Sequence, residues 1–120
     1  MKNETETLKI LQKIEDMMEY VYPALAQYPK SERFAMVADM KRSMDTMLER
    51  AIEAEKKYYK KTTLQELDVE IMKMKTYVKM SYRLGFLPDK KRNVMNDYLV
   101  EIGKMLGGWI KACQNREVKK

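Results

Sequence analysis

Apolar residues recur at steps of three and four positions along most of the chain, the spacing that puts side chains on one face of an α-helix. The pattern predicts four helices, over about residues 4–27, 31–61, 63–84 and 89–114, followed by a basic tail over 115–120. No stretch has the pattern of a strand. Because the connections are short and the helices similar in length, we expect an all-α fold, a single domain over residues 1–120 built as an antiparallel up-down-up-down four-helix bundle.

Each predicted helix is expected to contribute one apolar stripe to the core. In chain order the stripes are Ile10, Ile14, Met17, Val21 and Tyr28; Val37, Met40, Met44, Met47, Ala51, Ala54 and Tyr58; Leu64, Leu67, Ile71, Met74 and Val78; and Met95, Leu99, Ile102, Leu106, Trp109 and Cys113. The second stripe follows an unbroken heptad pattern.

Prolines mark the boundary between the first two predicted helices. Pro23 removes a backbone donor inside the first helix and should kink it. Pro29 should then end this helix, and Ser31 is a candidate N-cap for the second.

The later boundaries also have sequence signals. Thr63 with Glu66 three residues later has the spacing of a capping box, which predicts the start of the third helix. Gly85 suits the C-terminal cap of that helix, and Pro88-Asp89 the start of the fourth.

The predicted last helix carries Gly103, Gly107 and Gly108 beside the only tryptophan, Trp109. A glycine inside a helix costs roughly 1 kcal/mol relative to alanine. One explanation is that another backbone or a large side chain packs where a Cβ would clash, which makes this segment a packing or oligomer interface. The alternative is that Gly107-Gly108 simply ends the helix at Leu106.

Several helices carry apolar residues outside their core stripe, notably Tyr77 and Met80 on the third. The others are Leu48, Ile52, Tyr59, Leu84, Tyr98, Met105 and Ile110. A second apolar face favours a homo-oligomer, and 12 methionines would suit an adaptable packing surface. A single wide stripe, common in globular bundles, would also account for these positions.

Basic residues exceed acidic residues by 24 to 18, and the net charge of +6 suits an acidic partner such as nucleic acid. From residue 85 onward there are 8 basic and 4 acidic residues, so the excess lies toward the C-terminal half. Lys75, Lys79 and Arg83 follow one another at four-residue steps along one side of the third helix. Further candidates for phosphate contact are Lys111 and the cluster Lys56, Lys57, Lys60 and Lys61, which surrounds two tyrosines. Lysines on a solvated helix face are the alternative.

Histidine is absent, which excludes Ser-His and Cys-His nucleophile pairs, an imidazole base and a mixed Cys/His zinc site. Glu15, Asp16 and Glu19 resemble half of the acidic magnesium motif of the all-α nucleoside triphosphate pyrophosphohydrolases, but a second helix with a Glu-x-x-Asp pair is missing. We therefore interpret them as a solvated helix face and expect no catalytic residue, metal site or cofactor. A metal-dependent nucleotide hydrolase is the enzyme alternative.

Cellular location can be inferred only from simple signals. Cys113 is the only cysteine, so no intrachain disulfide can form, and the N-terminus lacks the apolar core of a secretion signal. No apolar run approaches the roughly 18 residues that span a bilayer. We expect a cytoplasmic protein that does not enter a membrane.

Four segments together resemble the accessory variability determinant (Avd) proteins of diversity-generating retroelements. They are Tyr20-Val21-Tyr22-Pro23, Tyr28-Pro29-Lys30-Ser31-Glu32-Arg33-Phe34, Leu84-Gly85-Phe86-Leu87 and Glu101-Ile102-Gly103-Lys104-Met105-Leu106-Gly107-Gly108-Trp109. The resemblance covers about residues 11–112, and its last segment is the most specific. The Avd proteins belong to a wider four-helix-bundle family that includes proteins encoded within 23S ribosomal RNA intervening sequences.

The resemblance implies a homopentameric, barrel-like ring that binds the element's reverse transcriptase and its template RNA. That complex makes adenine-mutagenised cDNA, and the accessory protein has no catalytic centre of its own. It also implies basic contact residues at Lys75, Lys79 and Lys104. Lysine stands where the family often has arginine, so bidentate phosphate recognition is in doubt while point-charge attraction remains.

We therefore expect a noncatalytic accessory protein for mutagenic reverse transcription, which binds the polymerase and RNA or cDNA through a basic surface. The alternative is a bundle of the intervening-sequence type, a structural or nucleic-acid-binding module without a reverse transcriptase partner.

Overall fold

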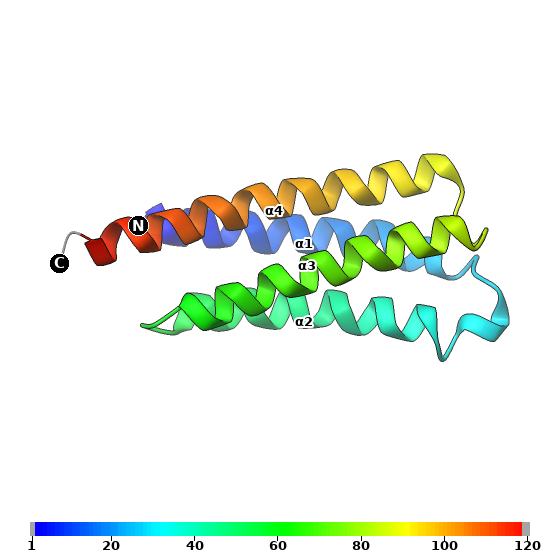
Figure 1. Cartoon of the computed structure of the whole chain (residues 1–120), viewed down its shortest axis with the longest axis horizontal. Helices are drawn as coiled ribbons and strands as arrows, with labels where there is room; N and C mark the ends of the chain where they lie inside the picture. Colours follow the sequence, from blue (N-terminus) through cyan, green and yellow to red (C-terminus); the bar gives the residue numbers. More distant parts are fainter. Residues whose placement is uncertain (1, 119–120) are drawn as a thin grey trace.

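The computed structural model describes residues 2–118, with side chains over 9–115, and over this range it is helical with no strand. The elements are α1 (Lys2–Leu25), the short 3-10 helix η1 (Lys30–Glu32), α2 (Met36–Lys56), α3 (Lys61–Arg83) and α4 (Asp89–Val118). The helices run alternately up and down an elongated molecule 52 Å long, with both ends of the chain at one end of the bundle (Figure 1). The predicted all-α four-helix fold is confirmed.

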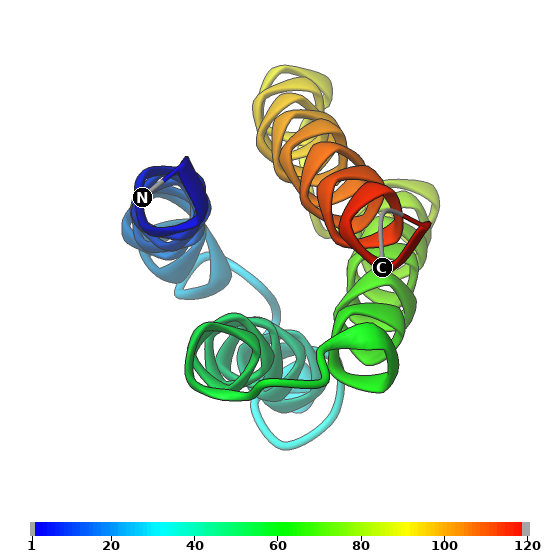
Figure 2. The ribbon, with the colours of Figure 1, turned by 90° about the vertical axis from the view of Figure 1, so that its left-hand side faces the viewer.

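The helices are arranged in a closed order in which α1 packs against α2 and α4, and α3 packs against the same two helices. Within the described residues the backbones of α1 and α3 do not lie side by side, nor do those of α2 and α4. The view along the bundle shows each helix at one corner (Figure 2). Every helix therefore has one inward face, two flanks against neighbours and one outward face.

The core consists of the predicted stripes, with two exceptions at their ends. All stripe residues are buried apart from Tyr58, which is 74% exposed, and Cys113, which is half-buried beside the core. The core includes six fully buried methionines: Met17, Met40, Met44, Met47, Met74 and Met95. Their flexible thioethers can fill irregular gaps between the helices.

Two small polar contacts join different helices inside the core. The Ser43 hydroxyl of α2 donates to the Glu70 carboxylate of α3 over 3.0 Å. The hydroxyls of Tyr28 and Ser81 each lie 3.7 Å from the Met40 sulfur. Burial raises the pKa of the Tyr28 phenol, while its hydrogen bond with Ser81 acts in the opposite direction.

The connection between α1 and α2 is longer than predicted, because α2 begins at Met36 and not near Ser31. Ser31 lies within η1 and is no N-cap. The Ala35 backbone, at φ −117° and ψ −105°, interrupts the helical path just before α2. The Glu32 carboxylate accepts a hydrogen bond of 3.4 Å from the Met36 backbone N–H, one of the donors that a helix start leaves unpaired.

The predicted capping box at Thr63 is wrong, because α3 already begins at Lys61. The Thr63 hydroxyl accepts a 3.2 Å hydrogen bond from the Lys57 ammonium, and Glu66 pairs with Arg50 of α2 at 3.6 Å. Both side chains of the supposed box are thus used in contacts with the C-terminal half of α2.

The end of α2 is closed by a lysine side chain. The helix stops at Lys56 because Lys57 turns to an extended conformation, with ψ 145°. The Lys60 ammonium then donates to backbone carbonyl oxygens of this end: Ala54, Glu55 at 3.4 Å and Lys57 at 2.6 Å. A cation here satisfies orphan carbonyls and lies at the negative end of the helix dipole.

The predicted boundary between α3 and α4 is confirmed. Gly85 has φ +82°, and its N–H donates to Tyr82 O while Phe86 N–H donates to Ser81 O, which is a Schellman motif. Asp89 begins α4 after Pro88, as predicted.

Residues Gly107 and Gly108 do not end the last helix, which continues unbroken to Val118 and includes most of the predicted tail. Inside the described chain no close approach requires these glycines, and the predicted oligomer interface stays a prediction. A Cβ built at Gly103, Gly107 or Gly108 would meet no described atom of this chain within 4 Å. Trp109, by contrast, is 1% exposed and belongs to the core. A need for the glycines would have to come from outside the chain.

The second apolar face is partly accounted for by wide core stripes. Five of its members are half-buried against the core: Leu48, Tyr77, Tyr98, Met105 and Ile110. Met80 is also half-buried, whereas Ile52 and Leu84 are 46% and 54% exposed. The molecule therefore keeps some exposed apolar surface, but less than the pattern alone suggests.

In the isolated chain α4 is helical at Gly108 and a methyl group meets open space, so Gly108→Ala should stabilise a monomer by about 1 kcal/mol. The matched control is Gly85→Ala, which forces alanine into a left-handed conformation and should destabilise by about 1 kcal/mol. Urea unfolding followed by circular dichroism measures both. Destabilisation by Gly108→Ala would show that the residue packs against a second molecule.

We expect Lys60→Met to lower the free energy of unfolding by about 1 kcal/mol, because it keeps the aliphatic stem but leaves the last carbonyls of α2 without their ammonium partner. Lys61→Met is the control, since that exposed neighbour begins α3 and should change stability by less than about 0.5 kcal/mol. Equal effects of the two substitutions in urea unfolding would contradict the capping role.

Candidate nucleic-acid interface

Three of the predicted contact residues form a row on α3, which we call the α3 row: Lys75, Lys79 and Arg83. Lys75 is half-buried and the other two are exposed. Each follows the previous one by four positions, so the three lie on one side of the helix. The prediction from spacing is therefore consistent with the helix found here.

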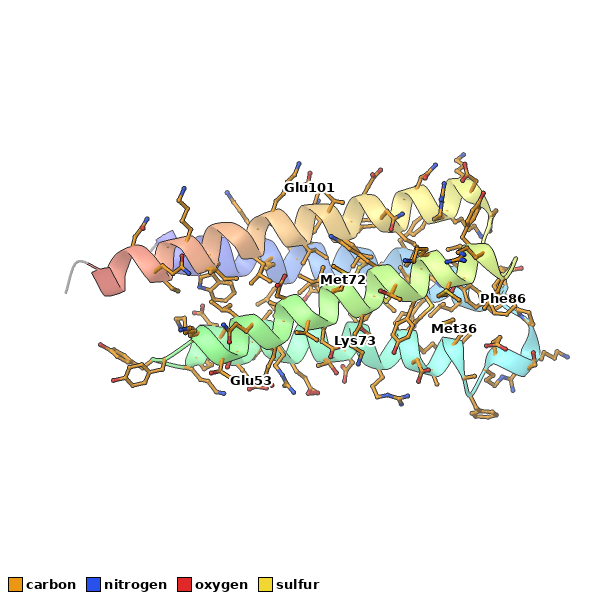
Figure 3. The ribbon with its side chains drawn as sticks, in the orientation of Figure 1. Met36, Glu53, Met72, Lys73, Phe86 and Glu101 are labelled. Carbon is orange, nitrogen blue, oxygen red and sulfur yellow. The ribbon has the colours of Figure 1, made fainter. Side chains whose placement is uncertain are left out.

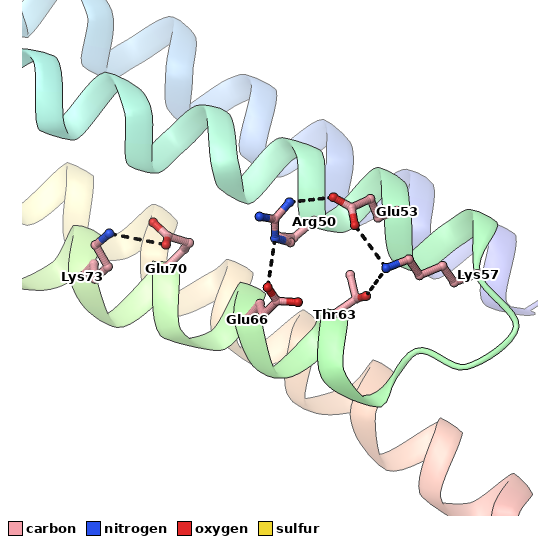
Figure 4. Close-up of polar contacts among 7 residues, drawn as sticks. All are labelled: Arg50, Glu53, Lys57, Thr63, Glu66, Glu70 and Lys73. Carbon is pink, nitrogen blue, oxygen red and sulfur yellow. Dashed lines mark hydrogen bonds and ion pairs between the residues drawn. The ribbon is translucent and has the colours of Figure 1, made fainter.

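The two flanks of α3 differ in how their charges are paired. On the flank toward α2, Glu66 pairs with Arg50 (Figure 4), and Glu70 accepts a hydrogen bond from Ser43. On the other flank, toward α4, the Tyr82 ring packs against the Arg92 guanidinium of that helix. Lys79 and Lys75 precede Tyr82 by three and seven positions, so they share that flank. Pairing between α2 and α3 thus takes Glu66 and Glu70 away from the α3 row. One exposed carboxylate, Asp68, lies seven positions before Lys75 on the same side as the row but forms no ion pair with it.

No ion pair links the α3 row to a carboxylate among the described residues. Like charges at four-residue steps on a helix repel one another by a few tenths of a kcal/mol per pair. The row therefore presents a line of positive charge that the protein's own described side chains leave uncompensated, which suits an anionic ligand.

A further cation of this flank, Arg92 of α4, was missed from the sequence. Its guanidinium lies 4.1 Å from the centre of the Tyr82 ring, and its Nη2 donates to Asp89 over 2.5 Å. Its buried Nε has no hydrogen-bond acceptor among the described atoms. The run Lys90-Lys91-Arg92 was a signal that could have found it.

The predicted residues on α4 form a separate group. Lys104 and Lys111 are exposed and seven positions apart, which places them on one side of the helix, away from the buried Ile102 and Leu106. Glu101, three residues before Lys104, also points outward (Figure 3). A carboxylate beside Lys104 weakens the positive field of this group. Because α3 and α4 are antiparallel, Lys111 lies toward the α2–α3 connection.

Two of the four lysines around the α2–α3 connection are engaged within the protein. The Lys57 ammonium pairs with Glu53 at 3.3 Å and donates to Thr63 (Figure 4). The hydrogen bond from Lys57 to Glu53 lowers the pKa of the Glu53 carboxyl, and the nearby charge of Arg50 lowers it further. Lys60 caps α2, as described above. Of the predicted cluster, Lys56 and Lys61 remain as exposed cations.

The acidic residues of α1 lie on its surface, where Asp16 accepts a 2.8 Å hydrogen bond from Gln12. Among the described residues no group of three His, Cys, Asp or Glu side chains could hold a metal ion. A shallow pocket of about 420 Å³ lies between α1 and the start of α4, lined by Glu19, Tyr20, Pro23, Ala24, Gln27 and Lys91. One carboxylate and one ammonium at its rim do not make the paired carboxylates that the hydrolase alternative needs.

Over the part of the chain that the structure describes, no helix is long and apolar enough to cross a bilayer.

Comparison with known proteins agrees with the resemblance seen in the sequence. The model of the bAvd-like family matches residues 8–113, which include α2, α3, most of α1 and α4, and every predicted contact residue. No curated protein matches the chain. The match spans most of the bundle, and we conclude that the chain belongs to the bAvd-like family.

Proposed function

We propose that this protein is a noncatalytic accessory factor of a diversity-generating retroelement, acting in the cytoplasm with the reverse transcriptase of that element. Membership of the bAvd-like family supports this role. The single structural observation that carries it is the α3 row, whose three cations form no ion pair with the described carboxylates. In this role the protein binds template RNA or cDNA, and the polymerase supplies the chemistry.

Binding to the phosphate backbone would release counterions and would depend little on base sequence. Lys75 and Lys79 suit such contacts because an ammonium on a flexible stem attracts phosphate as a point charge. Arg83 adds a planar guanidinium at the end of the row, and Arg92 extends the positive surface onto α4. Lys104 and Lys111 form a second, weaker group on the outside of α4.

We further propose that the protein assembles into a homo-oligomer, a pentameric ring as the family resemblance implies. Support comes from α4, where a Cβ at Gly103, Gly107 or Gly108 would meet no described atom of the chain. Helix glycines that serve no internal packing would let the backbone of a second protomer approach closely. The half-buried Tyr77 and Met80 on α3 would add apolar area to such an interface.

We expect Lys75→Ala with Lys79→Ala to weaken binding of unrelated single-stranded RNAs to a similar degree and to reduce the slope of log K against log salt by about 1.4, because two phosphate contacts are lost. Fluorescence anisotropy over a salt series measures the slope. Lys9→Ala with Lys13→Ala is the control, since these α1 lysines have the same spacing and similar exposure. Equal slopes for the two double variants would contradict the proposed surface.

Tagged protein co-expressed with the reverse transcriptase of the same element should retain both the polymerase and template RNA on purification. Light scattering of the protein alone should give several multiples of the 14.3 kDa chain. An oligomer that retains neither partner would favour the intervening-sequence type of bundle. A monomer at micromolar concentration would overturn the ring.

A further inference from the structure

The connection between α2 and α3 presents two adjacent aromatic side chains to solvent. Tyr58 is 74% exposed and Tyr59 is 84% exposed. The connection holds only residues 57–60, because α2 ends at Lys56 and α3 begins at Lys61. Large aromatic side chains gain most by burial, so two such rings side by side in water are unexplained by the fold.

Two lysine side chains of this connection bind to the neighbouring helices. Lys57 reaches forward to Thr63 of α3 and back to Glu53 of α2, at 3.2 and 3.3 Å. Lys60 reaches back to the last carbonyls of α2. The two lysines tie the short loop to both helices, one on each side of the tyrosines. A braced loop loses little conformational entropy when a ligand binds to it.

The two rings are set edge to face. Their centroids lie 4.8 Å apart and their planes are 82° apart. In this arrangement the edge of one ring meets the face of the other, and both rings stay mostly exposed. Flat apolar faces that point in different directions are suited to planar ligands that stack, rather than to a side chain that needs a closed pocket.

The electrostatic setting of the tyrosines is positive. Lys56 and Lys61, the residues at the two ends of the connection, are both exposed. Of the two carboxylates that precede the connection, Glu53 is engaged by Lys57 and Arg50 (Figure 4), and the half-buried Glu55 lies next to Lys56. Since Lys57 and Lys60 lie within the same loop, four cations surround two aromatic rings.

From this geometry we propose that the Tyr58-Tyr59 loop is a stacking platform for unpaired bases of single-stranded nucleic acid. Aromatic rings interleaved with cations are how proteins bind single strands without reading their sequence, since every base has a stackable face. Lys56 and Lys61 hold the flanking phosphates. The inference rests on the proposed function, and it adds base contact to a surface that otherwise meets only phosphate.

The position of the loop fits a strand that extends beyond the α3 row. Lys61 begins α3 at this end of the bundle, and the row follows along the same helix toward Arg83. Lys111 of the antiparallel α4 also lies toward this end. Between Lys61 and Lys75, α3 carries the exposed Asp68 and one cation, Lys73, which pairs with Glu70. A single strand would therefore meet positive charge at the row and again at the loop, where its bases would stack.

The test compares an unstructured oligouridine with an abasic oligonucleotide of the same length and charge, by fluorescence anisotropy. The natural protein should bind the base-bearing strand roughly tenfold more tightly. Tyr58→Ala with Tyr59→Ala should abolish this preference and leave binding to the abasic strand unchanged. Tyr58→Phe with Tyr59→Phe keeps both rings and should retain the preference.

Two further variants serve as controls. Phe34→Ala removes a side chain that is 89% exposed at the opposite end of α2, and it should leave the preference intact. Lys75→Ala with Lys79→Ala should weaken binding of both strands equally. Circular dichroism checks that each variant is folded, which is expected because none of the changed aromatic side chains is in the core.

The outcomes separate the two proposals. Equal binding of both strands by the natural protein would overturn the stacking platform and leave the electrostatic function standing. Binding of neither strand would overturn the proposed function itself. If the alanine variant kept its base preference but failed to retain the reverse transcriptase, the loop would be a protein-docking site and the stacking inference would be wrong.

Discussion

Burial of one apolar stripe from each of four helices is the interaction on which every other feature depends. A fully buried leucine, isoleucine or methionine contributes about 1.5–3 kcal/mol, and a single helix cannot bury its own stripe. Because each helix packs beside two of the others, the four stripes meet in one core. This closed order also fixes which flank of each helix meets a neighbour and which face meets solvent.

The distribution of charge follows from that order. Glu66 and Glu70 lie on the flank of α3 that meets α2, where they pair with Arg50 and Ser43. Lys75 and Lys79 lie on the other flank, beside α4. Packing thus pairs the carboxylates Glu66 and Glu70 on one side of the helix and leaves the cations of the other side without ion pairs among the described residues. The proposed RNA contact lies on this side of α3, where the unpaired cations would attract phosphate.

The glycine-bearing segment of α4 is the feature that the isolated chain explains least. Its glycines lower helix stability, yet no described atom of the chain occupies the space that a Cβ would take. Trp109, next to them, is fully inside the core, although its buried Nε1 has no hydrogen-bond acceptor among the described atoms. No contact within the described chain offsets the cost of the segment, which is the reason for proposing that a second protomer packs against it.

By itself the sequence determined the four helices, nearly all of the core and the α3 row, because helical periodicity is local and reads directly from spacing. It also identified Gly85 as a cap, since few residues other than glycine adopt a left-handed backbone. Tertiary structure decided the roles of the remaining polar residues. Whether Lys60 meets RNA or caps α2, and whether Thr63 caps α3 or binds Lys57, depends on the path of one short loop. Long polar side chains reach partners that spacing along a single helix does not specify.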